Sequence, residues 1–157
     1  MDRMKLSTKG RYGLRAMIDL AQYGGEEPVS LASIAARQNI SENYLEQLIA
    51  RLRKAELVEG FRGAGGGYLL KRPAEEISVG DILRALEGSL SPVECPGLLG
   101  KGGCSGEDLC VAKYVWKKIN ESVNRTVDEM KLSDLAEESR RVRDAKEDLR
   151  MHGIEEE

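Results

Sequence analysis

The sequence is poor in aromatic residues, which make up 4% of its 157 positions and include one Phe and one Trp. A large self-contained core is therefore not expected, because aromatic side chains bury the most apolar area per residue. Burial between subunits would help such a chain. The only histidine, His152, lies in a charged terminal stretch. No Ser/His/Asp or Cys/His arrangement is available for catalysis, so the sequence argues against an enzyme.

Long apolar runs are also lacking. No stretch is long enough to span a bilayer and no secretory signal is present, so we expect a cytoplasmic protein without membrane contact. Thiols stay reduced in that compartment. Clustered cysteines there indicate metal binding or redox activity rather than a disulfide framework.

Charge is distributed unevenly along the chain. Residues 1–72 carry a net charge of +4, whereas residues 73–157 carry −7. The basic part is attracted to phosphate and the acidic part is repelled by it. The asymmetry is consistent with nucleic-acid binding by the first half of the chain.

Hydrophobic spacing predicts three helices in the first part of the chain. The first runs from about 8 to 23, and Gly24-Gly25 ends it. Ser30 is expected to cap a short second helix, and Ser41 a third. Two short helices joined by a tight turn form a helix-turn-helix. The third helix is expected to face the core with Leu45, Leu48, Ile49 and Leu52.

The opposite face of the third helix is polar. Polar groups near a helix N-terminus can reach base edges in a major groove, and the cations that follow can hold phosphates. The alternative is a solvated face without such a role. The candidate DNA-contacting residues on this face are Asn43, Glu46, Gln47 and Arg51, followed by Arg53 and Lys54.

A glycine-rich hairpin is expected directly after this helix. Residues 57–61 and 67–70 are typical of short strands, and five of the residues from 60 to 67 are glycine. Such a tip can approach another backbone closely. The hairpin makes the domain a winged helix, and Arg62 at its base is placed to enter a minor groove. A simple turn is the alternative.

The second half predicts two more helices. Ser78 is expected to cap the first, and the longer one runs from Asp108 to about Met130. Its valines and isoleucine recur every four residues, so it needs a partner surface. A two-fold mate is one candidate and the first helix of the same chain is another. After a capped turn at 132–135, the charged tail is expected to be disordered.

The chain's three cysteines lie close together in sequence. Cys95, Cys104 and Cys110 occur in or just after a loop over 88–107 that contains six glycines, which preclude regular structure. Three thiolates can hold a metal or an iron–sulfur cluster and leave one coordination position to be filled.

Three stretches resemble the IscR/NsrR-type family of winged-helix regulators: MKLSTKGRYGLR (4–15), ISENYLEQL (40–48) and RGAGGGYLL (62–70). The resemblance implies a homodimer that binds palindromic promoter DNA and pairs through the long helix. It also implies base-reading residues and a minor-groove arginine. By this resemblance the base-reading residues are Ser41, Asn43, Glu46 and Gln47, and the minor-groove arginine is Arg62. The full set of expected DNA-binding residues also includes Tyr44, Arg51 and Gly63.

The cysteine region resembles the iron–sulfur members through KGGCSGEDLC (101–110). In those members three cysteines bind a [2Fe–2S] or a [4Fe–4S] cluster, and we favour [2Fe–2S] here. Lys113 replaces their histidine ligand, and Arg11 stands where the nitric-oxide sensors have an aspartate. The gap from Cys95 to Cys104 is also longer than usual. The fourth ligand therefore remains open, with Glu107, Asp108 or a small molecule as candidates.

A further stretch, ALEGSLSPVE (85–94), resembles the cysteine-metabolism repressors of the same family. Those proteins lack a cluster and respond through a partner enzyme. The alternative function is thus a cluster-free regulator that uses its cysteines as a thiol switch or a zinc site.

The expected fold is mainly α, a winged helix-turn-helix with a two-stranded wing and a long C-terminal dimerisation helix. Residues 1–87 are assigned to the DNA-binding domain and 88–107 to the cysteine-rich cluster-binding loop. Residues 108–135 are assigned to the dimerisation helix with its capping turn, and 136–157 to the disordered tail.

Overall fold

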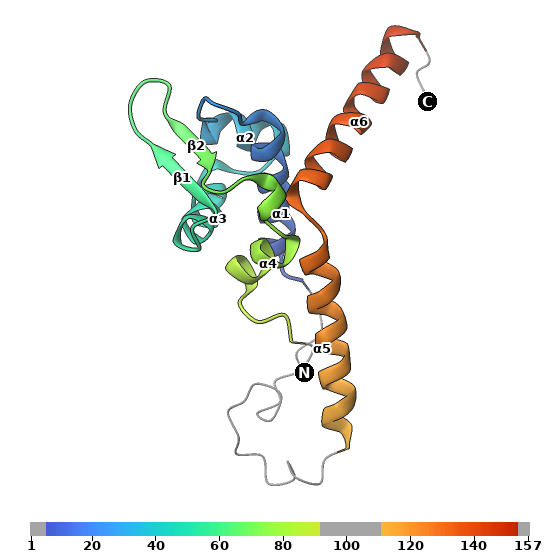
Figure 1. Cartoon of the computed structure of the whole chain (residues 1–157). Helices are drawn as coiled ribbons and strands as arrows, with labels where there is room; N and C mark the ends of the chain where they lie inside the picture. The colour runs from blue at the N-terminus through green and yellow to red at the C-terminus, as the bar shows by residue number, and fades with distance from the viewer. Residues whose placement is uncertain (1–5, 92–110, 154–157) are drawn as a thin grey trace.

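The computed structural model describes residues 6–91 and 111–153. Within these residues the chain is mainly helical, with one two-stranded antiparallel sheet, as predicted. A compact amino-terminal domain carries the sheet, and two long helices form a bent arm along its side (Figure 1). The elements, in order, are α1 (Thr8–Tyr23), α2 (Leu31–Gln38), α3 (Glu42–Lys54), β1 (Val58–Phe61), β2 (Gly67–Leu70), the 3₁₀ turn η1 (Ala74–Glu76), α4 (Val79–Glu87), α5 (Ala112–Glu129) and α6 (Leu132–Met151).

The helix-turn-helix is built from α2 and α3, each of which begins at a serine cap. The Ser30 hydroxyl accepts a hydrogen bond from the Ser33 N–H and the Ser41 hydroxyl one from the Tyr44 N–H, both at 3.2 Å. Asn39 ends α2 in the left-handed region, with φ 52°. Because Asn tolerates this conformation better than most residues, the chain can reverse between two helices in very few residues.

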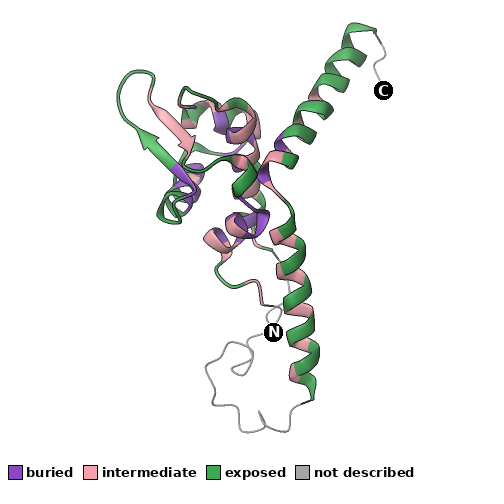
Figure 2. Ribbon diagram, in the orientation of Figure 1, coloured by how far each residue is buried: buried purple, intermediate pink, exposed green. Residues whose placement is uncertain are grey.

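The core lies where α1, α2, α3 and α4 meet, and buried residues concentrate there in Figure 2. The first turn of α6 adds Leu132 to this cluster. Burial of the apolar faces supplies the main stabilisation, at about 25 cal/mol per Å² of apolar surface. The largest fully buried side chains include Met17, Leu20, Ile34, Leu45, Leu48, Ile49, Leu52, Ile82, Leu86 and Leu132.

Two glycines let α4 approach α1 closely. A Cβ on Gly13 would lie 2.1 Å from Leu86 Cδ1, and one on Gly10 would lie 2.5 Å from Glu87 Oε1. Glu87 Oε1 accepts hydrogen bonds from the N–H groups of Ser7 and Gly10, both at 2.9 Å. The end of α4 thus caps the start of α1, which places a negative charge at the positive end of that helix dipole.

The hairpin predicted as a wing is present. Val58 pairs with Leu70 and Phe61 with Gly67 in antiparallel register. An isolated bridge between Val29 and Tyr68 also joins β2 to the segment before α2. The wing is therefore held to the helix-turn-helix by backbone hydrogen bonds of 2.8 and 2.9 Å.

The expectation of a disordered tail from residue 136 onward is wrong for residues 136–151. They belong to α6, which begins at Leu132 and continues to Met151, so the expected capping turn is its first turn. This segment contains no glycine or proline and is rich in good helix formers. Its start is held by Leu132 and Ala136, both buried. The high density of charged residues in this segment led to the prediction of disorder. In the structure these charged side chains lie on the exposed faces of a helix that packs on the domain.

Candidate nucleic-acid interface

The polar face of α3 is open to solvent. Its other face is buried through Leu45, Leu48, Ile49 and Leu52, so the helix can present only one side outward. The wing flanks this helix, and both lie on the side of the molecule away from α5 and α6 (Figure 1). A helix with an exposed polar face and a neighbouring hairpin is the arrangement that enters a major groove with its N-terminal half.

The structure brings most of the predicted site residues together on this surface. Asn43, Glu46, Gln47 and Arg51 are exposed along α3. Ser41 is exposed as well, and its hydroxyl oxygen already accepts from the Tyr44 N–H, which leaves its proton free to donate.

Tyr44 is half-buried rather than fully outward-facing. Its ring meets that of Tyr12 on α1 edge-on, with the two centroids 6.1 Å apart. The Arg15 guanidinium lies 5.2 Å from the Tyr12 ring centroid. Sequence reasoning did not single out Tyr12 or Arg15. Their spacing of three residues on α1 was the available signal, because it places both on one helix face.

The wing places Arg62 and Gly63 at an exposed tip. Gly63 has φ 99° and Gly65 has φ 77°, backbone conformations that other residues rarely adopt. A Cβ at either position would have nothing within 4 Å. The turn therefore needs these two glycines for backbone conformation, while the space around the tip stays open for another molecule.

Cations follow at the end of α3. Arg51, Arg53 and Lys54 lie in its last turn and are exposed. They complement the negative end of the helix dipole. They also add basic charge to this surface beyond the predicted DNA-contacting residues of α3, and such side chains are suited to phosphate contacts.

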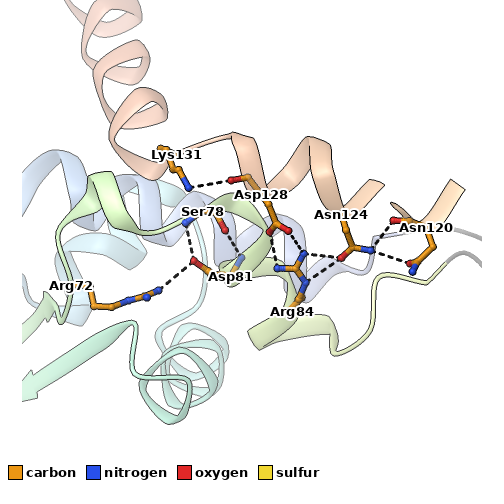
Figure 3. A network of polar contacts seen from close by, with 8 residues as sticks. All are labelled: Arg72, Ser78, Asp81, Arg84, Asn120, Asn124, Asp128 and Lys131. Carbon is orange, nitrogen blue, oxygen red and sulfur yellow. Dashed lines mark hydrogen bonds and ion pairs between the residues drawn. The ribbon is translucent and has the colours of Figure 1, made fainter. Parts of the chain in front are cut away.

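A polar network joins α4 to α5 (Figure 3). The Arg84 guanidinium donates to both carboxylate oxygens of Asp128 at 2.8 Å, and to Asn124 Oδ1 at 2.7 and 3.3 Å. The Asn124 amide in turn donates to the backbone and side-chain oxygens of Asn120. Gly80 makes room for this contact, because a Cβ there would lie 2.1 Å from Asp128 Oδ1.

The same network reaches the base of the wing. Asp81 and Ser78 form a reciprocal capping box at the start of α4. Asp81 Oδ2 also accepts a hydrogen bond of 3.3 Å from Nη2 of Arg72, which lies in the segment that follows β2. The hydrogen bonds from Arg84 lower the pKa of Asp128, and those to Asp128 raise the pKa of Arg84. Helix α4 therefore carries polar contacts to α5 through Arg84 and to the segment after β2 through Asp81.

The three predicted cluster ligands, Cys95, Cys104 and Cys110, lie outside the described residues. The segment that carries them follows α4 and precedes α5. Lys113, in the first turn of α5, places its ammonium 5.7 Å from the ring centroid of Tyr114. Within residues 6–91 and 111–153, no group of three His, Cys, Asp or Glu side chains is arranged to hold a metal ion.

The part of the chain that the structure describes also contains no helix long and apolar enough to cross a membrane.

Residues 6–138 match the Rrf2 family, described as iron-dependent transcriptional regulators. The chain belongs to the Rrf2 family. As a member it is a transcriptional regulator with a winged helix-turn-helix, rather than an enzyme.

Two named branches of the Rrf2 family are similar to this chain. The regulator IscR of Sodalis glossinidius is 43% identical over 84% of this chain and 78% of its own length. The regulator CymR of Bacillus subtilis is 49% identical over 85% of this chain and 90% of its own. Among solved structures, T. potens IscR has a TM-score of 0.69 at 50% identity, covering 86% of this chain and 88% of that one. The cysteine regulator CymR of B. subtilis has a TM-score of 0.71 at 48% identity, covering 85% of this chain and 96% of that one.

Proposed function

We propose that this Rrf2-family regulator reads a two-fold symmetric promoter site as a homodimer, with α3 in the major groove and the wing in the flanking minor groove. The exposed polar face of α3 beside an open, basic wing tip carries the proposal. In each half-site, Ser41, Asn43, Glu46 and Gln47 read base edges, and Arg51 holds a phosphate. Tyr44 and Gly63 complete the DNA-binding surface.

Glu46 has a distinct role in this arrangement. A carboxylate can accept a hydrogen bond from the amino group of cytosine, but it is repelled by phosphate. Glu46 is exposed and has no ion-pair partner among the described residues. It therefore discriminates between DNA sites more than it adds affinity.

The wing assignment is tested by Arg62→Ala in the full chain. Specific binding to a duplex selected by the wild-type protein from a randomised pool should weaken, and the slope of log affinity against log salt should become shallower. Arg150→Ala, at the exposed end of α6, is the matched control. Unchanged affinity for Arg62→Ala would show that the wing is misassigned.

The state of α5 in the single chain supports the proposed pairing through this helix. None of its residues is buried, and Tyr114 and Val115 are among the most exposed large apolar side chains. The repeating Val115, Ile119, Val123 and Val127 form one face of the helix. A second α5 would bury this face in both chains at once, as a two-fold interface requires.

For sensing, we infer that Cys95, Cys104 and Cys110 hold an iron–sulfur cluster, with [2Fe–2S] favoured over [4Fe–4S]. Three thiolates fit such a cluster, and a non-cysteine fourth ligand would make it exchangeable. The cluster would supply sensitivity to oxidants or nitric oxide. A protonated lysine ammonium has no lone pair, so Lys113 cannot serve as a ligand in that form.

The second candidate is a cluster-free regulator of the CymR type, with the cysteines as a thiol switch or a zinc site. Two observations favour it. Lys113 occupies the position where the iron–sulfur members have a histidine. Similarity to CymR is also comparable to similarity to IscR: the B. subtilis CymR structure is 48% identical with a TM-score of 0.71, and the T. potens IscR structure is 50% identical with a TM-score of 0.69.

Anaerobic purification separates the two candidates. A cluster predicts brown protein that contains iron and sulfide and lacks zinc, and Cys104→Ser should abolish the colour without preventing dimer formation. Colourless protein with one zinc per chain, or with reversibly oxidised thiols alone, would reject the cluster and support the alternative.

A further inference from the structure

α6 contacts α1, in the DNA-binding domain, beyond the point where the family match ends. That match stops at residue 138. Ser139 Oγ donates to Gln22 Oε1 at 2.6 Å, and the guanidinium carbon of Arg143 lies 5.1 Å from the ring centroid of Tyr23. Both contacts join α6 to the last turns of α1, so this part of the helix docks on the DNA-binding domain.

Tyr23 is shared between α6 and α2. Its ring centroid lies 4.1 Å from the guanidinium carbon of Arg37 on α2. Arg37 donates to both carboxylate oxygens of Asp19, from Nε at 2.9 Å and from Nη2 at 2.8 Å. Asp19 is only 1% exposed, and a buried carboxylate is tolerated only when it is paired and hydrogen-bonded. Arg37 is therefore fixed in place, and Arg143 contacts a ring whose position is tied to α2.

The contacts continue from Asp19 to the DNA-reading helix. Gln38, the last residue of α2, donates from Nε2 to Asp19 Oδ2 at 2.9 Å. Its backbone oxygen accepts from Arg15 Nη2 at 2.6 Å and its side-chain oxygen from Arg15 Nε at 3.3 Å. Arg15 lies over Tyr12, which meets Tyr44 in the first turn of α3. An unbroken series of contacts thus links α6 to the base-reading end of α3.

We propose that Arg143, with Ser139, is a positioning residue for DNA reading that acts through Tyr23 and Arg37 on the orientation of the helix-turn-helix, without touching DNA. The proposal rests on the DNA interface assigned above. α6 leaves the body on the side away from α3 and the wing, so a direct contact with the same duplex does not explain its attachment (Figure 1).

Arg143→Ala in the full chain tests the proposal, with Arg140→Ala as the matched control. Arg140 is an exposed residue of the same helix, and its loss changes the charge equally. Affinity for the duplex selected by the wild-type protein should fall about two- to five-fold for Arg143→Ala, as expected for a cation–π contact. Arg140→Ala should bind as the wild type does. The salt slope should stay unchanged for both variants, because no phosphate contact is lost.

A double-mutant cycle identifies the route. Tyr23→Leu should weaken binding at least as much as Arg143→Ala, because it removes the ring that both Arg143 and Arg37 contact. The double variant should be no weaker than Tyr23→Leu alone. Tyr23→Phe should retain wild-type affinity, because it keeps the ring. Arg143→Lys should restore part of the affinity. Hydrogen exchange of backbone amides in the turn between α2 and α3 should quicken in Arg143→Ala and not in Arg140→Ala.

Each contrary result has a defined meaning. Wild-type affinity for Arg143→Ala would overturn the positioning role while leaving the DNA interface intact. A salt slope that drops by about one unit would show that Arg143 contacts a phosphate directly and would also overturn it. Wild-type affinity for both Arg62→Ala and Arg143→Ala would overturn the wing assignment together with the positioning role, whereas weakened binding for Arg62→Ala alone would overturn only the positioning role.

Discussion

Arg84 and Asp128 form a bidentate ion pair between the amino-terminal domain and the arm, with two hydrogen bonds of 2.8 Å. Asp128→Asn removes the charge and keeps the shape. The Asp128 side chain is 47% exposed, so solvent screening limits the loss in the free energy of unfolding to about 1 kcal/mol. Urea unfolding at neutral pH measures this loss. Asp144→Asn, at an exposed position of α6, should cost almost nothing.

The same pair sets a pH dependence. The folded-state pKa of Asp128 is lowered from its ordinary value of 3.8, chiefly by the hydrogen bonds from Arg84. Its contribution to stability is therefore fully present above about pH 4, and it is lost as the pH falls through the lower folded-state pKa. The stability difference between wild type and Asp128→Asn should be constant from pH 5 to 8 and shrink below about pH 4. A difference that grew on acidification would contradict the assigned pair.

Gly13 offers a second test at a single residue. Gly13→Ala would bring a methyl group to 2.1 Å from Leu86 Cδ1, and Leu86 is buried and cannot move freely. Overpacking of this kind costs about 1–3 kcal/mol, and the better helix propensity of Ala returns about 1 kcal/mol. A net loss in thermal stability is expected. Gly25→Ala meets nothing within 4 Å and should leave the melting temperature unchanged.

Removing the serine cap of each helix in the helix-turn-helix tests whether the two helices have different roles in DNA binding. Ser41→Ala and Ser30→Ala each remove one cap at 3.2 Å, and each should lower the free energy of unfolding by about 1 kcal/mol. Only Ser41 lies at the start of the DNA-reading helix. DNA affinity should therefore fall further for Ser41→Ala than for Ser30→Ala at equal stability. Equal loss of affinity in the two variants would argue against base contacts at the start of α3.

Elements with clear local signals were predictable from sequence. The first helix was expected at 8–23 and α1 spans those residues, because its apolar spacing and the glycines after it are unambiguous. The three serine caps at 30, 41 and 78 and the two-stranded hairpin were likewise local features. α6 was missed beyond its first turn, because its burial depends on two side chains that dock on distant helices.

The supporting contacts of the candidate site were beyond sequence reasoning for a similar reason. Arg84 and Asp128 are 44 positions apart, so neither residue type nor spacing could pair them. The link from Tyr23 to Arg143 depends on how α6 folds back on α1. Outward-facing residues of α3 were predictable because a helix with one buried face leaves the other exposed.

The arm formed by α5 and α6 leads to a prediction about the oligomeric state of the whole molecule. Val115→Asp places a charge in the proposed α5 interface, which should shift the protein from dimer to monomer without unfolding the amino-terminal domain. Val142→Asp is the matched control on α6. The two valines are 52% and 60% exposed in the single chain, so both variants should fold equally well. Sedimentation velocity measures the outcome, and a dimeric Val115→Asp would place the interface elsewhere.

α5 buries none of its 18 residues within its own chain, and this links DNA recognition to protein abundance. In the proposed dimer the helix completes its burial by association, which is a second-order process. Occupancy of a two-fold promoter site would rise with the square of chain concentration while chains are scarce, and more gradually once they are paired. Expression level would then be a second input to the regulator, beside the proposed sensing through its cysteines.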